Sequence, residues 1–150
     1  MRAGDLVPSL YIDTNVLIYA FEGGHPSSAS LRPLFRQIED DELVAATSEL
    51  TLAEVLVRPY AKGATSLIAL FESILSGRDK IRVLPVDREI LRASARLRGG
   101  SRALKLADSI HVATAIAVGV ELFLSNDARL LRLLPPGIAG VSPGELPLGS

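Results

Sequence analysis

Four acidic residues occupy positions next to or within apolar segments, where an unpaired charge is costly. Asp13 and Asp127 each follow a short, mostly apolar run typical of a buried strand, whereas Glu54 and Asp108 fall inside largely apolar helical stretches. Because carboxylates are almost never buried unpaired, each acid needs a partner. For any one acid, a helix cap or an arginine pair explains the position as well as a shared cation does. The four together favour the cation.

Four carboxylates gathered within a few ångströms would repel one another. At an effective dielectric constant of about 20, each pair ~4 Å apart costs roughly 4 kcal/mol, so the cluster must be partly protonated or hold cations. The chain has no cysteine and only two histidines, His25 and His111. Oxygen ligands select hard ions, so we expect Mg2+, with Mn2+ as a substitute. Such ions suit phosphodiester hydrolysis, because they lower the pKa of a bound water.

The composition excludes several other classes of protein. The 150 residues fit a single domain, 1–150, and the absence of cysteine rules out a disulfide scaffold or a thiol nucleophile. No signal peptide is recognisable, and the longest apolar stretch, 115–125, is too short to span a bilayer. We therefore expect a cytoplasmic protein with no membrane contact. The formal charge of −1 lacks the basic excess usual in nucleic-acid binders.

Short apolar runs alternate with segments of helical periodicity along the chain. Strands are expected at 10–12, 43–47, 81–84, 121–125 and 138–141. Helices are expected at 16–20, 26–38, 50–57, 67–75, 87–97, 106–118 and 127–134. Pro59 is expected to end or bend the third helix, and the segment 135–150 should be a loosely structured tail apart from its short strand. The alternation predicts an α/β fold, a three-layer α/β/α sandwich with a mainly parallel central sheet of four to five strands.

This fold would bring the acids together. Parallel strands present their carboxyl ends at one edge of the sheet, where ligands bind in such folds. Asp13 and Asp127 should therefore lie at the same edge, with Glu54 and Asp108 reaching it from helices.

Around these acids the sequence resembles the PIN-domain family, in four motifs that occur in family order between residues 11 and 130. The motifs are YIDTNVLI at 11–18, SELTLAEVL at 48–56, LADSIHVATA at 106–115 and FLSNDARL at 123–130. The chain's length is also similar to that of the VapC toxins of toxin–antitoxin pairs. The resemblance implies a magnesium-dependent endoribonuclease that hydrolyses RNA. It also implies that Asp13, Glu54, Asp108 and Asp127 are its catalytic residues and metal ligands, with Asp127 acting directly or through water.

Three further residues of these motifs are expected to support the acids. Asn15 would orient them through its amide, with Thr14 beside it, and Ser125 would hydrogen-bond a water on the metal or a phosphate oxygen. The alternative for Asn15 and Ser125 is that each only caps or turns the chain. The family often has Thr where Ser125 stands, and the hydroxyl is kept.

Several cationic residues and one histidine allow two interpretations. Arg102, Lys105 and Arg58 are candidates for RNA binding, because phosphate contacts need positive charge. The basic run that starts at Arg88 is equally typical of a solvated helix face. His111 follows Asp108 by three residues, and a packed structural role is favoured over proton donation.

The resemblance also implies partners. A protein antitoxin would place an apolar segment on the helices at 27–38 and 50–77 and an Arg or Lys into the acids. A homodimer burying at least ~1,200 Å² is expected through the helices at 50–57 and 60–77, because residues 67–75 carry more apolar side chains than one helix face needs. The alternative is that these residues cover the sheet. The alternatives are a stand-alone RNA-processing nuclease and a PIN-fold binding module without activity. A response-regulator type of phospho-acceptor has poor support, because Asn15 stands where a second acid would be required.

Overall fold

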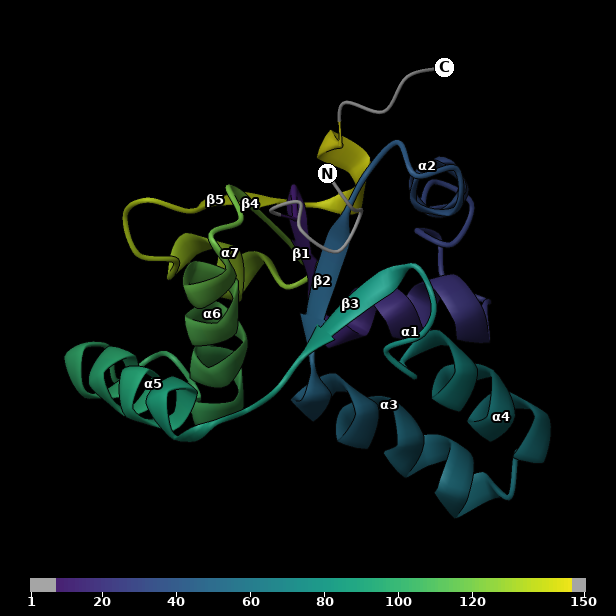
Figure 1. Cartoon of the computed structure of the whole chain (residues 1–150), viewed down its shortest axis with the longest axis horizontal. Coiled ribbons are helices and arrows are strands. Elements are labelled where there is room, and N and C mark those ends of the chain that lie inside the picture. Colours follow the sequence, from purple (N-terminus) through teal and green to yellow (C-terminus); the bar gives the residue numbers. More distant parts are fainter. Residues whose placement is uncertain (1–7, 147–150) are drawn as a thin grey trace.

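The computed structural model describes residues 8–146, which form a five-stranded sheet in which every pairing is parallel (Figure 1). The strands are β1 (Leu10–Ile12), β2 (Ala45–Ser48), β3 (Ile81–Leu84), β4 (Leu122–Leu124) and β5 (Ala139–Val141). Their order across the sheet is β3-β2-β1-β4-β5. The chain therefore builds outward from β1 in one direction and then in the other, which puts the switch point between β1 and β4.

Helices cover both faces of this sheet, which confirms the three-layer α/β/α prediction (Figure 1). One layer contains α1 (Thr14–Glu22), α2 (Arg32–Glu39), α3 (Glu49–Lys62) and α4 (Thr65–Ile74). The other contains α5 (Arg88–Gly100), α6 (Leu106–Val118) and α7 (Ala128–Arg132). None of the helices within residues 8–146 combines the length and apolarity that crossing a membrane requires.

The core divides into two clusters because successive strand residues point to opposite faces. In β1, Leu10 and Ile12 pack with α1, α2 and α4, whereas Tyr11 packs on the other face with Val112 and Leu130. All three side chains of β1 are buried. The central strand is thus covered on both faces, as is typical of parallel sheets.

Several element boundaries differ from the sequence prediction. Pro59 neither ends α3 nor stands outside it, since the helix runs on to Lys62 and Gly63 ends it at a positive φ of 65°. The segment 26–31 forms turns and α2 begins only at Arg32. The strand expected near the C-terminus is present as β5, which pairs with β4. Pro143–Glu145, in the tail that was expected to be loose, forms a 3-10 turn, and residues 147–150 lie outside the described residues.

Adjacent residues of α4 allow a test of which apolar side chains hold the layers together. Phe71 is fully buried, whereas Leu70 is 40% exposed. Phe71→Ala should lower the free energy of unfolding by about 3–5 kcal/mol, because it removes contacts and leaves a cavity. Leu70→Ala should cost under about 1 kcal/mol. Urea denaturation measures both, and equal losses would contradict this packing.

Candidate active site

The site begins with Asp13, whose carboxylate lies at the carboxyl end of β1, beside the switch point of the sheet. Its Oδ1 accepts a hydrogen bond from the Thr14 backbone N–H at 2.9 Å and so caps α1. Its Oδ2 accepts one from the Ser125 hydroxyl at 2.7 Å and a longer one from the Asn15 amide at 3.3 Å. Ser125 follows β4, so the two strands on either side of the switch point are joined through this carboxylate.

The Asp13 side chain is deeply buried, with the residue only 6% exposed. Burial raises the pKa of its carboxyl above the ordinary value of 3.8. The charge of His111 and the hydrogen bonds from Ser125 and Thr14 oppose this rise, and the nearby Asp108 adds to it. Within residues 8–146 no ion pair includes Asp13. A buried carboxylate that takes part in no ion pair is stabilised by a bound cation.

Glu54 reaches the same region from α3 and is held by two donors. Its Oε1 accepts a hydrogen bond from the Thr14 hydroxyl at 2.7 Å and lies 2.6 Å from His111 Nε2. Burial raises the pKa of Glu54, but the hydrogen bond and charge of His111, together with the bond from Thr14, outweigh it and lower the pKa. Glu54 therefore stays ionised at neutral pH.

His111 is 1% exposed and lies between Glu54 and Tyr11. An ionised carboxylate only accepts hydrogen bonds, so Nε2 of His111 must carry the proton that faces Glu54. On the other side of the ring, Nδ1 lies 2.6 Å from the Tyr11 hydroxyl. Burial raises the pKa of Tyr11 well above its ordinary value, so its hydroxyl keeps its proton. The chain Tyr11–His111–Glu54 fixes the orientation of the carboxylate from inside the core.

Asp108 and Asp127 share a guanidinium. Nη2 of Arg129 lies 2.9 Å from Asp108 Oδ2 and 3.4 Å from Asp127 Oδ2, and Nη1 donates to the Ala103 carbonyl at 3.0 Å. Asp127 also caps α7, since its Oδ1 accepts from the backbone N–H groups of Arg129 and Leu130. Two of the four acids therefore already share one cation from the chain itself, which balances one of their two charges.

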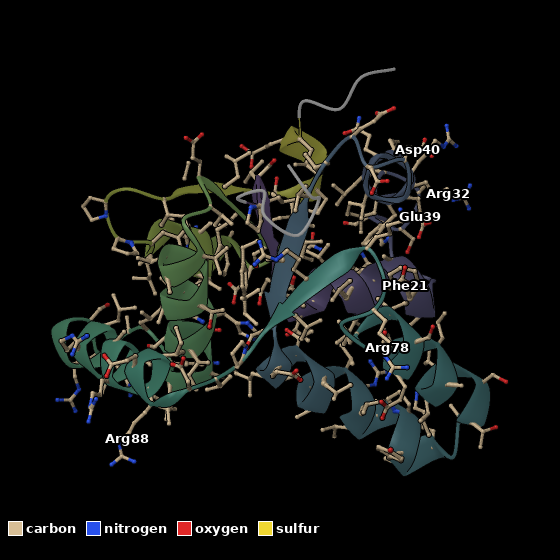
Figure 2. All side chains as sticks on the ribbon, viewed as in Figure 1. Phe21, Arg32, Glu39, Asp40, Arg78 and Arg88 are labelled. Atoms are coloured by element: carbon tan, nitrogen blue, oxygen red, sulfur yellow. The ribbon has the colours of Figure 1, made fainter. Side chains whose placement is uncertain are left out.

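The remaining candidate residues lie around this centre. Arg102 and Lys105 are exposed in the loop before α6, next to the carbonyl of Ala103 that Arg129 contacts. Arg58 is exposed on α3, one turn beyond Glu54. Arg88 points away from the rest of the molecule at the start of α5, as a solvated helix face requires (Figure 2).

The donor chemistry of the site fits a divalent cation. All four acids offer carboxylate oxygens, and the guanidinium between Asp108 and Asp127 stands in for a cation there. No group of three acids or histidines within residues 8–146 is close enough to bind one ion in this arrangement. An ion would therefore have to draw the acids closer and compete with Arg129.

Sequence reasoning missed two residues of the site, Arg129 and Tyr11. Arg129 stands two residues after Asp127 and its position in the first turn of α7 was the available signal, since a long cation there can reach back to the cap. Tyr11 lies between Leu10 and Ile12 in β1, and because strand residues alternate, its side chain is expected on the face of the sheet opposite to theirs. Nothing local indicates its contact with His111, which is 100 residues away.

Comparisons with known proteins give a family match and several structures of similar fold. The model of the PIN domain matches residues 10–133. A toxin–antitoxin complex from Klebsiella pneumoniae contains a chain with 24% identity and a TM-score of 0.67, and the match covers 92% of this chain and 100% of that one. DNA-bound VapBC from Salmonella typhimurium gives 18% identity and a TM-score of 0.72, with coverage of 91% and 98%.

FitAcB from Neisseria gonorrhoeae gives 18% identity and a TM-score of 0.68, with coverage of 91% and 99%. At these identities, the similarity to solved structures establishes a shared fold. No match is found among curated proteins.

The burial of Asp13 predicts an unusual effect of pH on stability in the absence of metal. Folding raises the pKa of Asp13 above 3.8, so the protonated carboxyl contributes to the free energy of unfolding. This contribution is fully present below pH 3.8 and is lost as the pH rises through the pKa of the folded state. Asp13→Asn should therefore raise the melting temperature in EDTA at pH 7, with a difference that shrinks towards pH 3. The exposed Asp40 provides the control Asp40→Asn. A lower melting temperature for Asp13→Asn at pH 7 would contradict this account.

Arg129 should weaken the binding of a divalent ion, because it occupies oxygens of two acids. Arg129→Gln should raise the affinity for Mn2+ by about 3-fold or more, measured by calorimetry without RNA. Arg132→Gln removes the same charge from an exposed position of the same helix and should change the affinity little. Equal effects of the two variants would show that only net charge matters.

Proposed function

Because this chain belongs to the PIN-domain family, we propose that it is a magnesium-dependent endoribonuclease, the toxin of a toxin–antitoxin pair. The observation that carries the proposal is the placement of four acids around the switch point. Asp13 and Asp127 lie at the carboxyl ends of β1 and β4, and Glu54 and Asp108 belong to the same electrostatic cluster.

The protein's own residues prepare this cluster for phosphodiester hydrolysis. A bound Mg2+, or Mn2+ in its place, would supply an activated water and offset charge on the phosphate. Ser125 and Asn15 hold the Asp13 carboxylate in one orientation. Thr14 and His111 hold Glu54 ionised, so that its oxygens are available to a cation at neutral pH.

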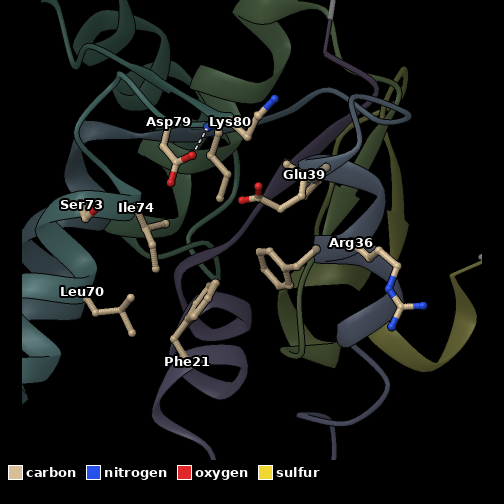
Figure 3. Close-up of a pocket in the computed structure, with 11 residues that line it drawn as sticks. Phe21, Arg36, Glu39, Leu70, Ser73, Ile74, Asp79 and Lys80 are labelled. Atoms are coloured by element: carbon tan, nitrogen blue, oxygen red, sulfur yellow. Dashed lines mark hydrogen bonds between the residues drawn. The ribbon is translucent and has the colours of Figure 1, made fainter.

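The proposal of an antitoxin partner is supported by an apolar pocket. The structures with similar folds include toxin–antitoxin complexes. A pocket of about 460 Å³ lies between α1, α2, α4 and β3, and Phe21, Phe35, Leu70 and Ile74 line it (Figure 3). Charged residues at its rim include Arg36, Glu39, Asp79 and Lys80. An amphipathic helix of the antitoxin would bury its apolar face here.

The proposed homodimer can use only part of the surface expected from sequence. Phe71, Ile74 and Leu75 are buried in the core and are not available to a partner. Val57 and Tyr60 of α3 are instead 65% and 61% exposed. Large apolar side chains at this exposure support an interface centred on α3.

Removal of Asp13 or Asp108 carboxylate charge should abolish RNA cleavage. In Mg2+, Asp13→Asn and Asp108→Asn should each reduce the rate on single-stranded RNA by at least about 100-fold, because the charges that hold the cation are lost. EDTA should stop RNA cleavage by the parent protein, and the Asp40→Asn variant should cleave RNA at the parent's rate. The assay is the release of fragments from a labelled RNA, with far-UV circular dichroism as a check of folding.

Cleavage by Asp13→Asn at the parent's rate would show that the acids are not the catalytic centre. Binding of RNA by the parent without cleavage in Mg2+ or Mn2+ would show that the domain is a binding module.

A further inference from the structure

A second pocket, of about 410 Å³, lies between the C-terminal halves of α1 and α3 and is separate from the four acids. It is lined by Ile18, Tyr19, Glu22, Gly23, Gly24, His25, Arg58, Lys62 and Leu67. The lining contains two cations against one carboxylate, and two aromatic rings. These are unlike the mostly apolar residues of the pocket assigned to the antitoxin.

The pocket extends away from the acids along α1 and α3. The hydrogen bond of 2.7 Å between Thr14 and Glu54 joins α1 to α3 at the active site. Four residues further along each helix, Ile18 and Arg58 line the pocket, and after four more Glu22 and Lys62 do so. Residues four apart share a helix face and are separated by about 6 Å along the axis. The pocket therefore starts one helical turn from Glu54 and extends for a second turn.

The side chains in this pocket match the chemistry of a single-stranded nucleic acid. The rings of Tyr19 and His25 stack at 3.7 Å between centroids and 8° between planes, and both residues are half-buried and line the pocket. Arg58 and Lys62 are exposed, and neither takes part in an ion pair within residues 8–146. Proteins bind single strands with cations along the backbone and aromatic rings under the bases.

We propose that this pocket binds the nucleotides on one side of the phosphodiester that is cleaved. Arg58 and Lys62 contact successive phosphates, and the Tyr19–His25 stack supports a base. The inference rests on the proposed nuclease function and assigns part of its substrate site. An acidic peptide would use the two cations, but it would gain little from a stacked pair of rings, so RNA is the occupant that uses the whole lining.

The test separates binding from cleavage. A fluorescent 12-nucleotide RNA with 2′-O-methyl groups is titrated with the full chain in EDTA, and anisotropy gives the Kd. Arg58→Gln should weaken binding by about 3-fold or more, and the slope of log K against log salt should fall by about 0.7, as expected for the loss of one phosphate contact. Arg78→Gln removes an exposed charge outside this pocket and is the control, expected to change neither value.

The aromatic pair is tested in the same titration. Tyr19→Leu should weaken binding by about 5-fold or more, because a stacking surface is lost, and Tyr19→Phe should restore it. Equal Kd values for Arg58→Gln and Arg78→Gln, or for Tyr19→Leu and Tyr19→Phe, would overturn the proposal. So would competition by oligoglutamate as effective as that by unlabelled RNA.

Failure of this inference is distinct from failure of the nuclease proposal. A parent that cleaves RNA in Mg2+ while its pocket variants bind and cleave like the controls keeps the nuclease and loses the pocket. A parent that fails to cleave, but whose RNA binding depends on Arg58 and Tyr19, keeps the pocket and loses the nuclease.

Discussion

The burial of one carboxylate, that of Asp13, organises the rest of this structure. β1 is covered on both faces, and its next residue after Ile12 carries a charge into the interior at the switch point. That charge is tolerated because Ser125, Asn15 and the N-terminus of α1 donate to it. These donors follow β1 and β4, the strands on either side of the switch point. The Asp13 carboxylate therefore links the two strands and also lies in the candidate catalytic site.

The other acids are held by two different hydrogen-bond donors, His111 and Arg129. His111 donates to Glu54 from the core, where its position is fixed by Tyr11 and cannot change without disturbing the packing. Arg129 reaches Asp108 and Asp127 from a side chain that is 37% exposed, so it has room to leave. The site thus combines an inner half that is buried in the core with an outer half whose cation is partly exposed. Such an arrangement lets the folded chain tolerate an acidic cluster.

Local patterns were enough for much of the fold. The strand at Ile81–Leu84 and the helix at Leu106–Val118 have the predicted bounds, because apolar periodicity and a terminating glycine are local signals. Pro59 was expected to end or bend the third helix, and the first of these alternatives was wrong. The packing of α3, in which Pro59 itself is buried, outweighs the hydrogen bond that a proline removes and the crowding by its ring. The turns at 26–31 likewise follow from local contacts around His25, such as the bond from the Ser27 N–H to its ring.

The sequence by itself determined the order of the elements, the three-layer architecture and the identity of the acids that follow β1 and β4. These depend on residue type and short-range spacing, which are visible in one dimension. Only the tertiary structure decided the contacts around the acids, such as those of Tyr11 with His111 and of Arg129 with Asp108. It also decided the position of the apolar pocket, on the face of the sheet opposite α5 and α6. These contacts join residues from 21 to 100 positions apart, and they depend on how side chains of different layers meet, which no local periodicity encodes.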